Sequence, residues 1–186
     1  MSQVLGKDPP RGYCTLVLAS TDTLVQSKRS HFRDWIVGDK PDPEICMTRP
    51  AISLDLADAR SLISAGERKA IEMNIPYNIA VVDAGGTLVA HVRMDGAWLG
   101  SVDIAINKAW TARAFDMSTD DLSHFAQSGQ QGFGINTTNG SRVVIFGGGI
   151  PVKRDGVVIG AVGASGGSVK QDVEVAEAAV AGLNGR

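Results

Sequence analysis

Hydrophobic and polar positions follow a helical rhythm from Ser53 to Asn74, where the regular part of the chain begins. Apolar side chains recur there among residues that favour helices: Leu54, Ala57, Leu62, Ala65 and Ile71. This spacing is typical of an amphipathic helix with one buried face. The segment Asn74 to Pro76 holds a helix-breaking proline and ends the pattern.

The next pattern has a period of two and predicts a β-hairpin. Two β-rich runs, NIAVVD at 78–83 and TLVAHVRM at 87–94, flank the short turn Ala84-Gly85-Gly86. Alternation along the second run predicts a polar face and a core face: Thr87, Val89, His91 and Arg93 on the first, and Leu88, Ala90, Val92 and Met94 on the second. His91 and Arg93 then share a face that meets either solvent or a cavity.

The remaining elements complete a sheet with helices against it. Helical spacing predicts helices over 99–115 and 120–131, and a last helix over 169–183. Strands are predicted in RVVIF at 142–146 and in IPVKRDGVVIGAVGA at 150–164, where Asp155-Gly156 forms a hairpin turn. Because this order lacks the regular alternation of βαβ units, it indicates an α/β protein of the α+β type with an antiparallel sheet.

The junction between the last strand and the last helix is the most informative segment. Ser168 occupies the N-cap position and Gln171 follows three residues later, which is the spacing of a capping box. Ser165, Gly166 and Gly167 precede it, and their backbone N–H groups could receive a carboxylate or phosphate at the helix start. The glycines are equally explained by a tight turn and close packing. No dinucleotide or P-loop motif is present.

Composition narrows the class of protein. With 186 residues, 44% hydrophobic and 20% charged, the chain is long enough for one folded domain. A net charge of −2 without a basic run argues against nucleic acid as a partner. No run approaches the roughly 18 to 20 apolar residues of a membrane helix, so we expect no membrane contact and a cytoplasmic location.

The first fifty residues differ from the rest. They hold five of the seven prolines, which predicts an irregular N-terminal arm over 1–50 before a domain over 51–186. The histidines are His31, His91 and His124, and neither they nor the two cysteines show the spacing of a metal site. We therefore expect no dedicated metal centre.

Several segments together resemble the GlcG/HbpS family, often described as a haem-degrading domain. They are VVDAGGTLVAHVRMDGA (81–97), KAWTA (108–112), GGGIPVKRDGVVIGAVGASGG (147–167) and QDVEVAEA (171–178). The resemblance covers about 51–186. It implies a profilin-like or roadblock-like arrangement around a five-stranded antiparallel sheet, and self-association into dimers up to octamers.

The resemblance leaves function open, because family members include haem binders, part of a cobalamin adenosyltransferase and companions of catabolic enzymes. Haem is therefore a possible cofactor. Haem iron usually takes an axial ligand such as histidine, but none of the three histidines matches a ligand position of the family.

The residues themselves suggest an anion site at the strand ends. Arg93 and the turn 165–168 could hold a carboxylate, while Asp95, His91 and Lys108 could move protons or supply an amine. Each could instead be an ordinary surface, turn or packed residue.

Two functional hypotheses follow. The first is a cytoplasmic catabolic protein that binds a small anionic, unsaturated metabolite, such as an aromatic ring-cleavage product or a hydroxy acid, and hydrolyses or deaminates it. The alternative is a haem-binding or haem-degrading protein of the HbpS type. In both, the partners are a small molecule and further copies of the same chain.

Overall fold

The structure is a computed structural model that describes residues 51–183. The arm predicted over 1–50 lies outside the described residues, as does His31. The description below therefore concerns the part of the chain that follows Pro50.

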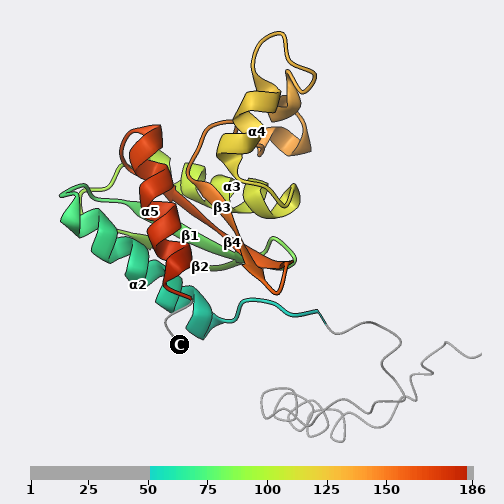
Figure 1. Cartoon of the computed structure of the whole chain (residues 1–186). Coiled ribbons are helices and arrows are strands. Elements are labelled where there is room, and N and C mark those ends of the chain that lie inside the picture. The colour runs from blue at the N-terminus through green and yellow to red at the C-terminus, as the bar shows by residue number, and fades with distance from the viewer. Residues whose placement is uncertain (1–50, 184–186) are drawn as a thin grey trace, which may run out of the picture. The chain divides into compact units, whose positions relative to one another are not determined.

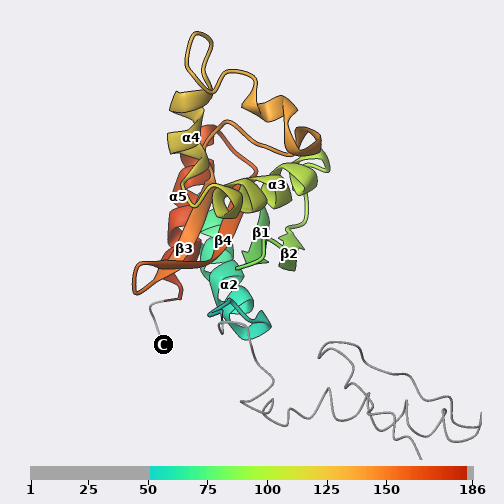
Figure 2. The same ribbon diagram turned by 90° about the vertical axis from the view of Figure 1, so that its right-hand side faces the viewer.

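The domain is built on one antiparallel sheet of four strands in the order β2-β1-β4-β3. The strands are β1 (Asn78–Asp83), β2 (Leu88–Arg93), β3 (Gly149–Arg154) and β4 (Val157–Ser165). The helices are α2 (Leu56–Glu72), α3 (Gly100–Ala114), α4 (Thr119–Ala126) and α5 (Val169–Ala181), with short 3-10 turns at Ile135–Thr137 and Asn139–Ser141. Figure 1 shows α2 and α5 side by side, and Figure 2 shows α3 on the other side of the sheet.

The larger core lies between the sheet and the pair α2 and α5. Leu62 of α2 and Val175 of α5 are fully buried against Ile79 and Val81 of β1. Since these side chains recur with helical spacing on the helices and alternate on the strand, the core follows directly from the hydrophobic pattern.

The second layer brings α3 unusually close to the sheet. Ala105, Ala109 and Ala112 form the buried stripe of α3 and meet Ala80 and Ala161 of the strands. A methyl group added at Gly163 of β4 would lie 2.1 Å from the carbonyl oxygen of Ala105. Small side chains on both elements therefore permit backbone contact between α3 and β4.

The predicted caps and turns are confirmed where the chain changes direction. Ser168 and Gln171 form the expected capping box at the start of α5. Asp155 and Gly156 both have positive φ angles, as a two-residue hairpin turn requires. The Asp83 carboxylate accepts hydrogen bonds from the backbone N–H groups of Gly85 and Thr87, each 2.8 Å long, which stabilises the β1–β2 turn.

The fold class is confirmed, but the sheet has four strands instead of the five that the family resemblance implied. The segment 142–146, predicted as a strand, is irregular. The backbone N–H of Val144 donates to the Thr111 hydroxyl of α3 at 3.1 Å, and that hydroxyl lies 3.5 Å from the Arg142 carbonyl oxygen. A helix side chain thus holds this segment where a neighbouring strand was expected.

The predicted faces of β2 are correct only in part. The pairing register of β1 and β2 shifts between Val81 and Val82, which oppose Ala90 and Leu88 respectively and leave Val89 as the extra residue. This bulge interrupts the alternation. Leu88 is 43% exposed instead of buried, and Val89 packs against the larger core. Beyond the bulge, His91 and Arg93 share a face as predicted.

Among the described residues, no helix has both the length and the apolar character needed to cross a membrane.

Candidate functional site

A buried ion pair joins the middle of α3 to the start of α5. The Lys108 ammonium lies 2.5 Å from the Asp172 carboxylate and donates to the carbonyl oxygen of Ala164 at 3.0 Å. Lys108 is fully buried, and the Phe146 ring lies 4.8 Å from its nitrogen. Burial lowers the pKa of Lys108 below its ordinary value, while the charge of Asp172 acts in the opposite direction.

The second oxygen of Asp172 holds the glycine turn before α5. It accepts hydrogen bonds from the backbone N–H groups of Gly166 and Gly167, each 3.1 Å long. Ser168 is engaged as well, because its backbone N–H donates to the Gln171 side chain at 2.9 Å. The N–H groups that the sequence offered to an anion are thus already occupied by side chains of α5, and an anion would have to displace them.

Tyr77 completes this buried region. The residue is fully buried, and its hydroxyl makes no hydrogen bond with the described residues. Burial raises the pKa of the Tyr77 hydroxyl, and the negative charge of Asp172 raises it further. Tyr77 therefore stays neutral beside the ion pair across the physiological pH range.

A second polar group lies on the sheet face toward α3. The pairing registers place Ser165, Asn78 and Arg93 in one row across β4, β1 and β2. The Asn78 side-chain nitrogen donates to the Trp98 carbonyl oxygen at 3.0 Å, and the Arg93 Nε donates to that of Ala97 at 2.9 Å. Asn78 is fully buried, yet its Oδ1 has no hydrogen-bond partner among the described residues.

His91 belongs to the same face, one row further along β2. It lies opposite Ala80, which packs against α3. Its Nε2 is buried and has no hydrogen-bond partner in the described part of the chain. Burial lowers the pKa of His91 below its ordinary value, so the imidazole is neutral at neutral pH. A buried ring nitrogen without a partner is uncommon and calls for a ligand, a water molecule or a rearrangement.

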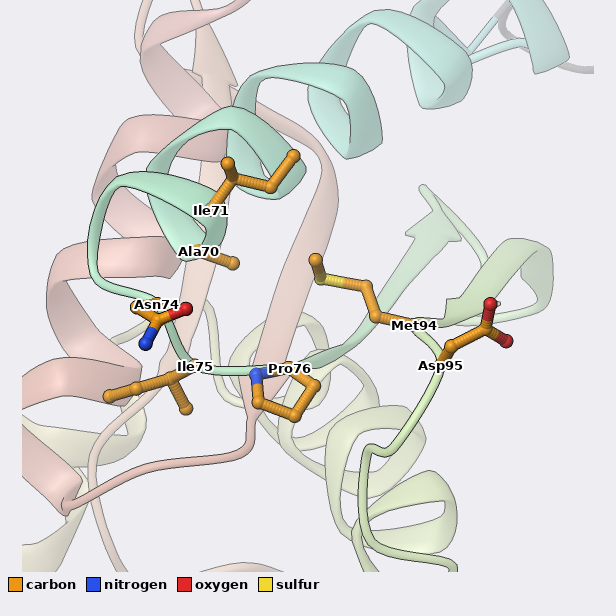
Figure 3. A pocket seen from close by; sticks show the side chains of 7 residues that line it. All are labelled: Ala70, Ile71, Asn74, Ile75, Pro76, Met94 and Asp95. Atoms are coloured by element: carbon orange, nitrogen blue, oxygen red, sulfur yellow. The ribbon is translucent and has the colours of Figure 1, made fainter.

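Asp95, the third residue predicted to move protons, is exposed beyond the end of β2. It borders a shallow hollow whose wall also includes Ile71, Pro76 and Met94. Figure 3 shows the Asp95 carboxylate pointing away from Ile71, while the Met94 side chain points toward it. His124 is also exposed, in the last turn of α4.

The predicted site residues thus fall into two groups. Lys108 lies with the turn 165–168, and His91 lies with Arg93 near the start of α3. Within residues 51–183, Arg93, Asp95 and Lys108 do not converge on one cavity, and their catalytic or binding roles stay predictions.

Asp172 and Asn78 were not predicted from the sequence as parts of a site. An acidic residue in the first turn after a glycine-rich turn was the available signal for Asp172, because such a carboxylate can accept from the preceding N–H groups. No signal identified Asn78, whose importance depends on strand pairing.

Within residues 51–183, no group of three or more histidine, cysteine, aspartate or glutamate side chains could hold a metal ion. Haem, the cofactor that the family resemblance suggested, brings its own metal, so the question is whether the residues present fit it. A neutral imidazole whose Nε2 has no hydrogen-bond partner among the described residues is the kind of donor that could hold haem iron, so the chemistry of His91 fits this group.

Comparisons with known proteins agree with the fold. A Citrobacter freundii protein of 15.0 kDa, encoded between dhaT and dhaS, is 45% identical over 69% of this chain and 90% of its own length. The crystal structure of Klebsiella pneumoniae protein ORFY is 39% identical, with a TM-score of 0.74 over 76% of this chain and 98% of that one. The crystal structure of a PduOC and haem complex is 40% identical, with a TM-score of 0.68 over 70% of this chain and 95% of that one.

The family model described as haem degrading protein HbpS-like matches residues 54–181. This range includes every helix and strand named above. The chain therefore belongs to the HbpS-like family.

Proposed function

We propose that this domain binds haem and that His91 would hold the iron through its Nε2. The observation that carries the proposal is the His91 Nε2 atom, which is buried and has no hydrogen-bond partner among the described residues. Because burial disfavours protonation of the ring, the imidazole is neutral at neutral pH, and its Nδ1–H tautomer offers the Nε2 lone pair to a metal. Haem iron, when bound, would provide the redox and ligand-exchange chemistry of the complex.

The surroundings of His91 suit the rest of a haem molecule. Arg93 shares its face of β2 and is exposed, so its guanidinium can pair with a propionate carboxylate. Trp98 and Leu99 are 70% and 74% exposed and lie just before α3. The backbone carbonyl of Trp98 is bonded to Asn78, which keeps this apolar pair at the same end of the sheet. Such side chains can cover a porphyrin ring.

Access to His91 requires a local movement. Its Nε2 is buried by the surrounding residues, so a neighbouring side chain must move before iron can reach it. The relative solved as a haem complex supports the ligand class, since it shares 40% identity with this chain. The second described histidine, His124, is exposed on α4, and its substitution serves as the control for substitution of His91.

The hydrolysis or deamination favoured by the sequence has less support. Lys108 is fully buried in its ion pair, and the Gly166 and Gly167 amides are occupied by Asp172. Asp95 lies exposed beside a shallow hollow. These residues do not present an activated nucleophile or base to a shared cavity in the described domain.

The proposal is tested by titrating haemin into the full chain and following the Soret absorbance. We expect saturable binding that weakens at least tenfold in His91→Ala, while His124→Ala and His31→Ala retain it. Added imidazole should restore the Soret position of His91→Ala by filling the space of the lost ring. Unchanged binding and spectrum in His91→Ala would show that another residue holds the iron.

A further inference from the structure

Two adjoining hollows lie where β2 ends and the chain turns toward α3. The first has a volume of about 320 Å³ and is lined by Arg93, Met94, Asp95 and Gly96. The second has a volume of about 260 Å³ and is the hollow of Figure 3, which shares Met94 and Asp95 with the first. Since small-molecule sites begin at roughly 300 Å³, the two hollows have room for a small metabolite only.

The first hollow carries two opposite charges that do not neutralise each other. Arg93 and Asp95 are both exposed, and within residues 51–183 neither forms an ion pair. The Arg93 Nε donates to the Ala97 carbonyl oxygen at 2.9 Å, which anchors the guanidinium. Its two terminal nitrogens have no hydrogen-bond partner among the described residues. The hollow therefore offers both a cation and an anion to one ligand.

The second hollow is mainly apolar. Ile71 is 66% exposed on its wall, and Ile75 and Pro76 are half-buried there. Figure 3 shows the Met94 side chain extending from the side of Asp95 toward Ile71. Met94 thus connects the charged hollow to the exposed Ile71 side chain, and a short aliphatic chain lying along it would remove apolar surface from water.

We propose that the two hollows bind a free α-amino acid with an aliphatic side chain. The Arg93 guanidinium pairs with its carboxylate, the Asp95 carboxylate pairs with its ammonium, and its side chain lies on Met94 and Ile71. Asp95 would repel a purely anionic ligand and Arg93 a purely cationic one, so the pair of charges selects a ligand that carries both. This ligand differs from the anionic metabolite expected from the sequence, and its binding does not depend on haem.

The proposal is tested by titrating L-leucine into the full chain without haemin and following the amide NMR signals of Met94 and Gly96. We expect saturable shifts with a Kd on the order of 1 mM, because exposed ion pairs and one small apolar contact are each weak. The probe 4-methylpentanoate lacks the ammonium, and 3-methylbutylamine lacks the carboxylate. Both should bind at least about threefold more weakly than leucine. Shifts that do not saturate, or equal affinity for either single-charge probe, would overturn the proposal.

Two variants separate the charges. Asp95→Asn should weaken leucine binding about threefold and strengthen the binding of 4-methylpentanoate, because the repelling carboxylate is gone. Arg93→Met should weaken leucine binding by a similar factor and strengthen that of 3-methylbutylamine. The control Arg154→Met removes an exposed charge from β3 and should leave all three affinities unchanged. If Asp95→Asn and Arg93→Met weakened all three ligands together, the residues would have only a structural role and the proposal would be wrong.

A third variant tests the apolar contact. Ile71→Ser and its control Ile52→Ser both change side chains that are more than half exposed, at 66% and 56%, so neither should unfold the domain. We expect Ile71→Ser to weaken leucine binding at least about threefold and to leave the affinity for glycine unchanged, while Ile52→Ser alters neither. An equal loss for leucine and glycine in Ile71→Ser would contradict the placement of the aliphatic chain in the second hollow.

Discussion

Removing the Lys108 side-chain charge should destabilise the domain more than any surface substitution. In Lys108→Met, the ion-pair partner disappears while Asp172, 4% exposed at its side chain, keeps a buried negative charge. Breaking a buried pair in this way costs about 3–5 kcal/mol, because the remaining charge is uncompensated. Such a loss is a large fraction of the roughly 5–15 kcal/mol by which domains of this kind are stable.

The double variant Lys108→Met/Asp172→Asn separates charge from packing. Its asparagine oxygen can still accept from the Gly166 and Gly167 amides, and no unpaired charge remains buried. We expect it to recover at least about 1.5 kcal/mol relative to Lys108→Met. Lys170, exposed in the first turn of α5, provides the control Lys170→Met, which should change stability by less than about 0.5 kcal/mol.

Urea unfolding followed by circular dichroism measures these differences, provided that the m-values agree among the variants. A cost below about 1 kcal/mol for Lys108→Met would refute the reasoning, since it would mean that the Asp172 charge reaches solvent. Strict additivity of the Lys108 and Asp172 substitutions would refute it as well, because contacting residues should show coupling.

Two further predictions concern the layer between α3 and the sheet. Gly163→Ala should destabilise the domain by about 1–3 kcal/mol, since its methyl would meet the α3 backbone, whereas Gly100→Ala, with open space around it, should be neutral or stabilising in the same unfolding assay. The lowered pKa of His91 means that the unfolded chain takes up this proton first as the pH falls below about 6.5, so stability decreases from there until the folded-state pKa is reached. Unfolding at pH 7.5, 6 and 5 should show this decrease in the natural chain and a smaller one in His91→Gln; equal slopes would contradict the assignment.

Local patterns were sufficient to predict most of the fold. The capping box of Ser168 and the Asp155-Gly156 turn depend on neighbouring residues only, so their chemistry is visible in the sequence. The segment 142–146 was predicted wrongly because its β-rich composition gives no hint of Thr111, 33 residues before Val144, which binds its backbone. Tertiary contacts override local propensity there.

The candidate site was harder to predict from the sequence than the fold, because it also depends on tertiary contacts. Its residue types were recognised, but the groupings depend on strand register and on where α3 crosses the sheet. Lys108 was predicted to move protons or supply an amine, yet the close contact of α3 with β4 buries it against Asp172. No single-sequence pattern contains that distance.

The polar groups around Asp172 and around His91 differ in how well their hydrogen bonds are satisfied. Around Asp172, two backbone N–H groups and the Lys108 ammonium satisfy one buried carboxylate. This fully bonded network stabilises the local structure. Around His91, a buried nitrogen lacks a partner, and the buried Asn78 oxygen on the same face lacks one too. An unsatisfied buried polar atom costs about 1–3 kcal/mol, so a ligand that bonds to one of these atoms recovers that amount in addition to its other contacts. This difference is the reason to look for binding at the edge strand β2 and for structural support at the Lys108 ion pair.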